Sequence, residues 1–73
     1  MISNVDSAII QFLDEHSGKA LQKDIMAAMR VTFSEGHVYG RLRTLEARGY
    51  LEKARDTSGR VLIFLVKDSE VRV

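Results

Sequence analysis

The residues with the most chemical potential lie in one stretch, "SEGHVYGRLRTLEARGYLEK", Ser34 to Lys53. Arg41 and Arg43 stand out, because a guanidinium presents two parallel donors to the acceptor pair on a guanine edge or bridges phosphate oxygens. The alternative for each arginine is that it is a solvated surface charge paired with Glu46 or Glu35. The stretch therefore predicts contact with double-stranded DNA.

Other polar side chains in the same stretch could join that contact. Ser34 could hold a phosphate at a helix N-terminus, where free amides favour anions, or it could serve only as a helix cap. His37 and Tyr39 could donate hydrogen bonds to phosphates or bases, although the Tyr39 ring could instead lie on the edge of the core. Thr44 occupies an outward or flanking position and is also a candidate for DNA contact.

Two glycines, Gly36 and Gly40, fall on the outward side of the same predicted helix. Glycine in an exposed helix costs about 1 kcal/mol relative to alanine, so its presence there calls for a use. A backbone without side chains can approach a groove wall or another chain closely. Tolerance by a well-packed helix is the alternative.

A second group of cations surrounds the sequence "DTSG". Lys53 and Arg55 share one face of a strand by their two-residue spacing, and Arg60 follows the turn. They predict positive charge at a hairpin tip, where phosphate contacts would give salt-sensitive affinity. The alternative is that these charges only keep an exposed strand edge soluble. Lys23, further upstream, could add a phosphate contact or be an ordinary surface lysine.

The elements that must position these residues follow from periodicity and end signals. Ser3 is the expected cap of the first helix, with Asp6 three residues later, and Gly18 and Gly49 are the expected helix ends. The expected elements are helices at 4–16, 21–29 and about 34–48, strands at about 50–55 and 60–67, and an unassigned tail at 68–73.

The apolar residues of the three helices recur at helical spacing and predict one shared core. The expected core positions are Val5, Ala8, Ile9, Phe12, Leu13, Leu21, Ile25, Ala28, Met29, Val38, Leu42, Leu45 and Leu51. Three helices followed by a β-hairpin, with the third helix the most basic, predict an α+β fold of the winged helix-turn-helix type. A three-helix core with a stray hairpin is the alternative.

The segment from Gly36 to Leu51 resembles the winged helix of the PadR family. The matching residues are Gly36, Val38, Tyr39, Leu42, Leu45, Glu46, Gly49 and Leu51, and the family's Gly-Arg wing is echoed by Gly59, Arg60 and Phe64. MarR-like and small phage regulators share much of this pattern. The chain departs from PadR in having Gly40 where proline is common and in lacking space for a long C-terminal dimerisation helix. The resemblance implies a DNA-binding transcriptional regulator, with its third helix in the major groove and its wing on the backbone or minor groove.

Length and composition narrow the possible functions. The 73 residues allow one small domain, 1–73, and the net charge of +1 conceals a basic block, because residues 37–60 hold six Lys or Arg against three Asp or Glu. With no cysteine, two distant histidines and no Gly-rich phosphate loop, we expect no enzyme, metal, cofactor or small-molecule ligand. No targeting or membrane-spanning segment is expected, and the absence of cysteine fits the cytoplasm.

The strand "VLIFLV" is apolar on both faces. One set, Leu62, Phe64 and Val66, is a candidate homodimer surface, together with Ile10 and with Val71 from the tail. The alternative is that one set packs on the first helix while the tail folds over the other.

A different function also fits the sequence, namely a winged helix that binds protein, as an adaptor or as a subunit of a larger nucleoprotein assembly. Near-neutral charge, Glu35 at the proposed groove entrance and an exposed Phe33 would favour it.

Overall fold

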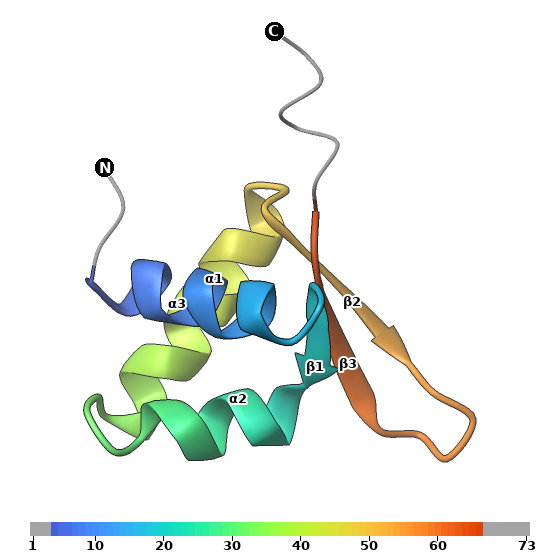
Figure 1. Cartoon of the computed structure of the whole chain (residues 1–73), viewed down its shortest axis with the longest axis horizontal. Helices are drawn as coiled ribbons and strands as arrows, with labels where there is room; N and C mark the ends of the chain where they lie inside the picture. Colours follow the sequence, from blue (N-terminus) through green and yellow to red (C-terminus); the bar gives the residue numbers. More distant parts are fainter. Residues whose placement is uncertain (1–3, 67–73) are drawn as a thin grey trace, which may run out of the picture.

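The computed structural model describes residues 4–66, and these residues form three helices and three short strands (Figure 1). The class is α+β, with one antiparallel sheet. In chain order the elements are α1 (Asn4–Glu15), β1 (Lys19–Leu21), α2 (Gln22–Met29), α3 (Glu35–Ala47), β2 (Leu51–Arg55) and β3 (Val61–Leu65).

The helix ends lie close to where local signals predict them. Gly18 has φ 87° after α1, and its amide donates to the Leu13 carbonyl at 2.7 Å, which ends the helix in a left-handed turn. Gly49 has φ 86° after α3, and the next amide, that of Tyr50, donates to the Leu45 carbonyl at 2.9 Å. The expected cap Ser3 lies outside the described residues.

The strand β1 was not expected from the sequence. Residues 19–21 pair antiparallel with β3, with Ala20 opposite Ile63, so the expected two-stranded hairpin is in fact a three-stranded sheet of order β1-β3-β2. Leu21 therefore ends a strand instead of beginning a helix. The sheet order makes β3 the central strand, paired along both of its edges.

One core joins the helices to the inner face of the sheet. Of the residues that the structure describes, ten hydrophobic side chains are buried in this core: Val5, Ile9, Leu13, Ile25, Met29, Val38, Leu42, Leu45, Leu51 and Ile63. The expected core is confirmed except at two positions. Ala28 of α2 is exposed, and Met26 packs against the core instead. Leu21 is half-buried and is not among the core residues. Because Val38, Leu42 and Leu45 are turned into this core, the opposite side of α3 faces outward.

The hairpin of β2 and β3 extends away from the helices, with its turn at the far end (Figure 1). This order of three helices and a sheet is compatible with a winged-helix topology. Within residues 4–66, no helix is long and apolar enough to cross a membrane.

Candidate nucleic-acid interface

The outward side of α3 carries most of the expected contact residues. Gly36, His37, Tyr39, Gly40 and Arg43 are all exposed, since they lie opposite or beside the buried stripe. Tyr39 is 42% exposed, so its ring is not absorbed into the core. This part of the predicted surface is therefore available to a partner.

Ser34 acts as a helix cap. Its backbone is extended, with φ −69° and ψ 148°, and its Oγ accepts a hydrogen bond from the His37 amide at 3.3 Å. This interaction satisfies one of the unpaired amides of the first turn. The cap reading from the sequence is thus confirmed, and the His37 side chain remains exposed.

Arg41 is not part of the outward surface. Its Nε donates to Asp6 Oδ1 at 2.9 Å and its Nη2 donates to Asp6 Oδ2 at 2.8 Å, which is a bidentate ion pair between α3 and α1. The Asp6 side chain is only 2% exposed, so the carboxylate requires this partner. The hydrogen bonds that Arg41 donates to Asp6 raise the pKa of Arg41, against a smaller opposing effect of desolvation. The expectation that Arg41 faces DNA, or else Glu46 or Glu35, is corrected by this contact.

Thr44 and Arg43 of α3 differ in whether their polar groups are already used within the protein. Thr44 is only half-exposed, and its Oγ1 donates back to the Gly40 carbonyl at 3.0 Å, so its hydroxyl proton is already used within the helix. Arg43 forms no ion pair with any other residue of the described range 4–66. Arg43 is therefore the arginine of α3 that retains a guanidinium for an external acceptor.

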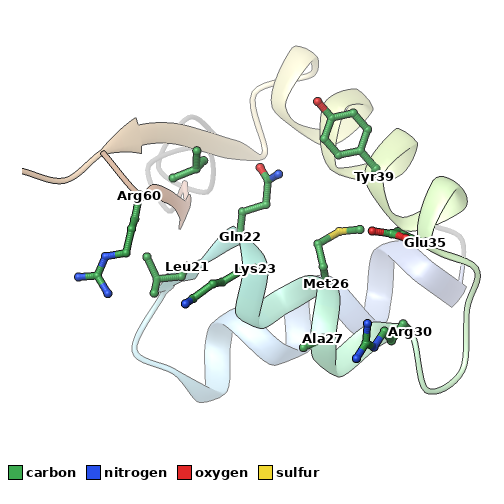
Figure 2. A pocket seen from close by; sticks show the side chains of 10 residues that line it. Leu21, Gln22, Lys23, Met26, Ala27, Arg30, Glu35, Tyr39 and Arg60 are labelled. Carbon is green, nitrogen blue, oxygen red and sulfur yellow. The ribbon is translucent and has the colours of Figure 1, made fainter. Parts of the chain in front are cut away.

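A groove of about 590 Å³ lies between α2, the start of α3 and the start of β3 (Figure 2). Figure 2 shows Tyr39 and Glu35 of α3 across from Gln22 and Met26 of α2, with Arg60 at the far end. The residues that line it are Leu21, Gln22, Lys23, Met26, Ala27, Arg30, Glu35, Tyr39, Arg60 and Val61. We call this feature the α2–α3 groove.

The charges of the α2–α3 groove are mostly positive. Lys23, Arg30 and Arg60 line it, against one acidic residue, Glu35. Lys23 and Arg30 have no ion pair with other residues in the part of the chain that the structure describes. The rim can therefore attract an anion, and Glu35 weakens that attraction at one end.

The three cations of the hairpin are partly used within the protein. Lys53 Nζ lies 3.8 Å from Glu46 Oε1, which directs it toward α3 and away from the turn. Arg60 Nε donates to Asp56 Oδ2 at 2.9 Å, and Arg55 Nη1 donates to the Gly59 carbonyl at 2.8 Å. Only Arg55 and Arg60 lie near the hairpin tip, so the expectation of three cations there is wrong for Lys53.

The turn of the hairpin is organised by Asp56. Its Oδ1 accepts hydrogen bonds at 2.9 Å from the amides of Ser58 and Arg60 and from the Ser58 hydroxyl. These bonds, led by the one from the Arg60 amide, lower the pKa of Asp56 from 3.8 to about 2. Gly59 has φ 85°, a conformation that glycine adopts without strain. The wing turn is therefore held in one conformation at neutral pH.

Sequence reasoning did not identify three residues that matter here. Gln22 and Arg30 lie on and just after α2 and line the α2–α3 groove, but nothing in their spacing marks them. Asp6 was interpreted as part of a helix cap. The position of Asp6 could have predicted an ion pair, because Asp6 lies next to the buried stripe of α1, where a carboxylate needs a cationic partner.

The candidate dimer residues do not form one surface. Leu62, Phe64 and Val66 are half-buried and share one face of β3, whereas Ile10 belongs to α1, which packs on the opposite face through Ile9 and Leu13. Val71 lies outside the described residues. Ile10 is therefore removed from the candidate surface.

Phe33 is also placed differently from the expectation, because it is half-buried and packs against the core. It offers no exposed ring to a protein partner. Within residues 4–66, no group of three or more His, Cys, Asp or Glu side chains is arranged to hold a metal ion.

Comparison with known proteins adds no assignment. No protein-family model, curated protein or solved structure gives a significant match to this chain.

Proposed function

We propose that this chain is a winged helix-turn-helix domain that binds double-stranded DNA sequence-specifically, as a small transcriptional regulator. The recognition helix is α3, residues 35–47, and the wing is the hairpin of β2 and β3. The observation that carries the proposal is the position of the exposed α3 face beside a basic groove. On that face Arg43 has no ion pair within residues 4–66, and Gly36 and Gly40 are uncovered.

The two glycines support close approach by a large partner. A Cβ added to Gly36 or Gly40 would meet nothing within 4 Å, and neither residue has a positive φ. The isolated fold therefore has no need of glycine at either position, although each glycine destabilises a helix. A duplex whose groove walls approach the helix backbone would supply the reason.

In the proposed complex, α3 lies in the major groove and the residues divide by role. Arg43 reads a base edge or grips a phosphate, and Tyr39 and His37 donate hydrogen bonds at the groove walls. Lys23 of α2 and Arg30, just after α2, contact phosphates. Arg55 and Arg60 of the wing contact the backbone or minor groove. The resemblance to PadR-like and MarR-like regulators in residues 36–51 agrees with this arrangement.

The test is a fluorescence anisotropy titration with random-sequence duplex DNA at about 50 and 200 mM salt. We expect binding that weakens steeply with salt. Arg43→Ala should weaken binding at least about tenfold, which corresponds to the loss of one good arginine contact. Arg48→Ala is the matched control, because this exposed arginine caps the same helix about 140° around its axis from Arg43 and should change affinity little.

The phosphate contacts have a separate signature. Lys23→Ala and Arg30→Ala should each reduce the slope of log affinity against log salt by about 0.9, since one phosphate contact is lost in each case. Selection of bound sequences from a random duplex pool would then give the recognised site. Equal loss of binding in the Arg43 and Arg48 variants would reject the assigned face.

A second candidate, a winged-helix adaptor that binds protein, is favoured by one observation. Glu35 lines the α2–α3 groove and opposes phosphate there. Glu35→Gln distinguishes the two functions, because removal of that charge should tighten DNA binding a few-fold if phosphates pass along the groove. Absence of DNA binding in both the parent chain and this variant would favour the adaptor.

A further inference from the structure

Among residues 4–66, no helix packs on one of the two faces of the sheet. Side chains alternate along β3, so Val61, Ile63 and Leu65 pack into the core while Leu62, Phe64 and Val66 point the other way. None of the latter three belongs to the core cluster or to the hydrophobic residues that pack against it. We call this second surface of the sheet the outer face.

The register of the sheet places the neighbours of these residues in rows. Phe64 is paired with Lys19 on β1 and with Glu52 on β2, so the three residues form one row across the outer face. Each row thus has an apolar residue of β3 in the middle. In the Phe64 row, the two ends are a lysine on one edge of the sheet and a glutamate on the other.

The adjacent row is apolar throughout. Leu62 is paired with Leu21 on β1 and with Ala54 on β2. Lys19 and Glu52 are both exposed, and neither forms an ion pair with another residue of the described range 4–66. The outer face therefore has an apolar centre and unneutralised charges of opposite sign at its two edges.

We propose that two copies of this chain pair face to face through the outer face, about a two-fold axis parallel to β3, with Lys19 of each copy over Glu52 of the other. A rotation about such an axis keeps every residue at the same height along the strands and exchanges the two edges of the sheet. β1 of one copy then lies over β2 of the second copy.

This symmetry makes the face complementary to itself. Phe64 and Leu62 meet their own counterparts on the axis, Leu21 lies over Ala54 of the second copy, and both Lys19–Glu52 pairs form at once. Apolar residues face apolar residues, and each charge faces its opposite. The pairing follows from the register alone.

The other face-to-face arrangement is unfavourable. A two-fold axis in the plane of the face but perpendicular to the strands, through the Phe64 row, would place each edge of the sheet over the same edge of the second copy. Lys19 would then face Lys19, and Glu52 would face Glu52. Like charges opposed across an interface are penalised, so the charges select the axis parallel to β3.

The distances in such a pair are feasible. Packed sheets lie about 10 Å apart, a gap that a lysine and a glutamate side chain can close together. Aligned sheets cross at about 30°, and β1 and β2 lie about 4.8 Å from the axis, so the crossing displaces the paired residues by only about 2–3 Å. The flexible lysine side chain can absorb that displacement.

The axis also determines where the wings lie. Because height along the strands is preserved, the wing turns of the two copies project at the same end of the dimer, side by side. The turn lies at the far end of the hairpin from the helices (Figure 1). If the chain binds DNA as proposed, both wings can reach the same duplex. The dimer itself does not depend on DNA binding.

The test uses sedimentation equilibrium of the full chain without DNA, at protein concentrations up to about 1 mM. The samples are the parent, Lys19→Glu alone, Glu52→Lys alone, an equimolar mixture of these two variants, and the double variant. Circular dichroism on each sample monitors folding. Glu35→Lys, an exposed charge reversal away from the sheet, is the matched control.

We expect the apparent mass of the parent at the highest concentration to approach twice 8.2 kDa. Each single reversal creates two like-charge contacts and should raise the dimer dissociation constant about tenfold or more. Mixing the single variants restores both opposite-charge contacts in a heterodimer, and the double variant restores them in a homodimer, so both samples should return to within about threefold of the parent. The Glu35→Lys control should dimerise as the parent does.

Three outcomes would overturn the proposal. A parent chain that stays monomeric would mean that the outer face is not a dimer surface. Single reversals that dimerise like the parent would place the interface elsewhere. A mixture that fails to recover, although its components are folded, would reject the axis. Phe64→Glu gives a second check, since a charge on the axis should abolish the dimer in a chain that still folds.

Discussion

Arg41 of α3 donates two hydrogen bonds, at 2.9 and 2.8 Å, to the two carboxylate oxygens of Asp6 in α1. This contact joins helices whose paired residues are 35 positions apart in the chain. It fixes the rotation of α3 about its axis, because Arg41 must face α1 while Val38 and Leu42 face the core. The exposed side of α3 is thereby determined from within the protein.

The first prediction concerns this ion pair. Asp6→Ala removes the carboxylate that the Arg41 guanidinium binds, and Arg41→Ala removes the cation paired with a carboxylate that is 2% exposed. Each change should lower Tm by roughly 5–15 °C, measured by circular dichroism. The double variant should lower Tm by less than the sum of the two single effects, because both members of the ion pair are then removed together. Additive losses would mean that the two groups are not coupled.

The second prediction concerns Gly40. Gly40→Ala should stabilise the fold by about 0.5–1 kcal/mol, because its Cβ would enter open space and alanine favours helix. The same variant should weaken duplex binding about tenfold if the helix backbone approaches a groove wall. Urea denaturation and anisotropy measure the two effects separately.

Gly49 provides the contrasting variant. Its φ of 86° is strained for alanine, so Gly49→Ala should destabilise the fold by about 1 kcal/mol. If Gly40→Ala gains stability and leaves DNA binding unchanged, the close-approach role of Gly40 is rejected.

The third prediction is a pH dependence of the wing. The pKa of Asp56 is lowered from 3.8 to about 2, so its ionised form stabilises the folded turn at and above about pH 4. That stabilisation should be lost as the pH falls from about 4 through 2. A carboxyl titration by NMR should place the Asp56 midpoint near 2.

Amide exchange reports the same event in the turn. The amides of Ser58 and Arg60, which donate to Asp56, should lose protection in this acidic range. In Asp56→Ala both amides should already be poorly protected at pH 5, and the acidic loss should vanish. A midpoint near 4 in the parent chain would contradict the bonded turn.

The fourth prediction tests the two faces of β3. Ile63 is 3% exposed and lies under the helices, so Ile63→Ala should reduce the free energy of unfolding by about 2–5 kcal/mol. Leu62→Ala, on the outer face of the same strand, should destabilise the fold less when measured at a concentration low enough to keep the chain monomeric. Equal effects of the two substitutions would show that something covers both faces in one chain.

The sequence predicted the helices well because their signals are local. Gly18 and Gly49 mark left-handed turns, Ser34 marks a start, and the apolar spacing of Val38 and Leu42 determines an inward side. β1 has no such signal. Three residues are too few for an alternation, and Ala20 becomes part of a strand only because Ile63, far along the chain, lies beside it.

The candidate site follows the same division. Exposure of Tyr39 and Arg43 could be predicted, since it depends on the periodicity of one helix. The withdrawal of Arg41 depends on how α1 crosses α3, and the contribution of Arg30 to the α2–α3 groove depends on how α2 lies beside α3. Contacts between elements are set by packing, which a single sequence does not display.

The sheet order has a consequence for how the chain is made. β3 lies between β1 and β2 although it is synthesised after both, so neither edge strand has a backbone partner until residues 61–65 have left the ribosome. Until then the nascent helices lack Ile63 and the complete sheet on which they pack. The sheet, the wing and the outer face therefore form together, in one late step of folding, when β3 becomes available.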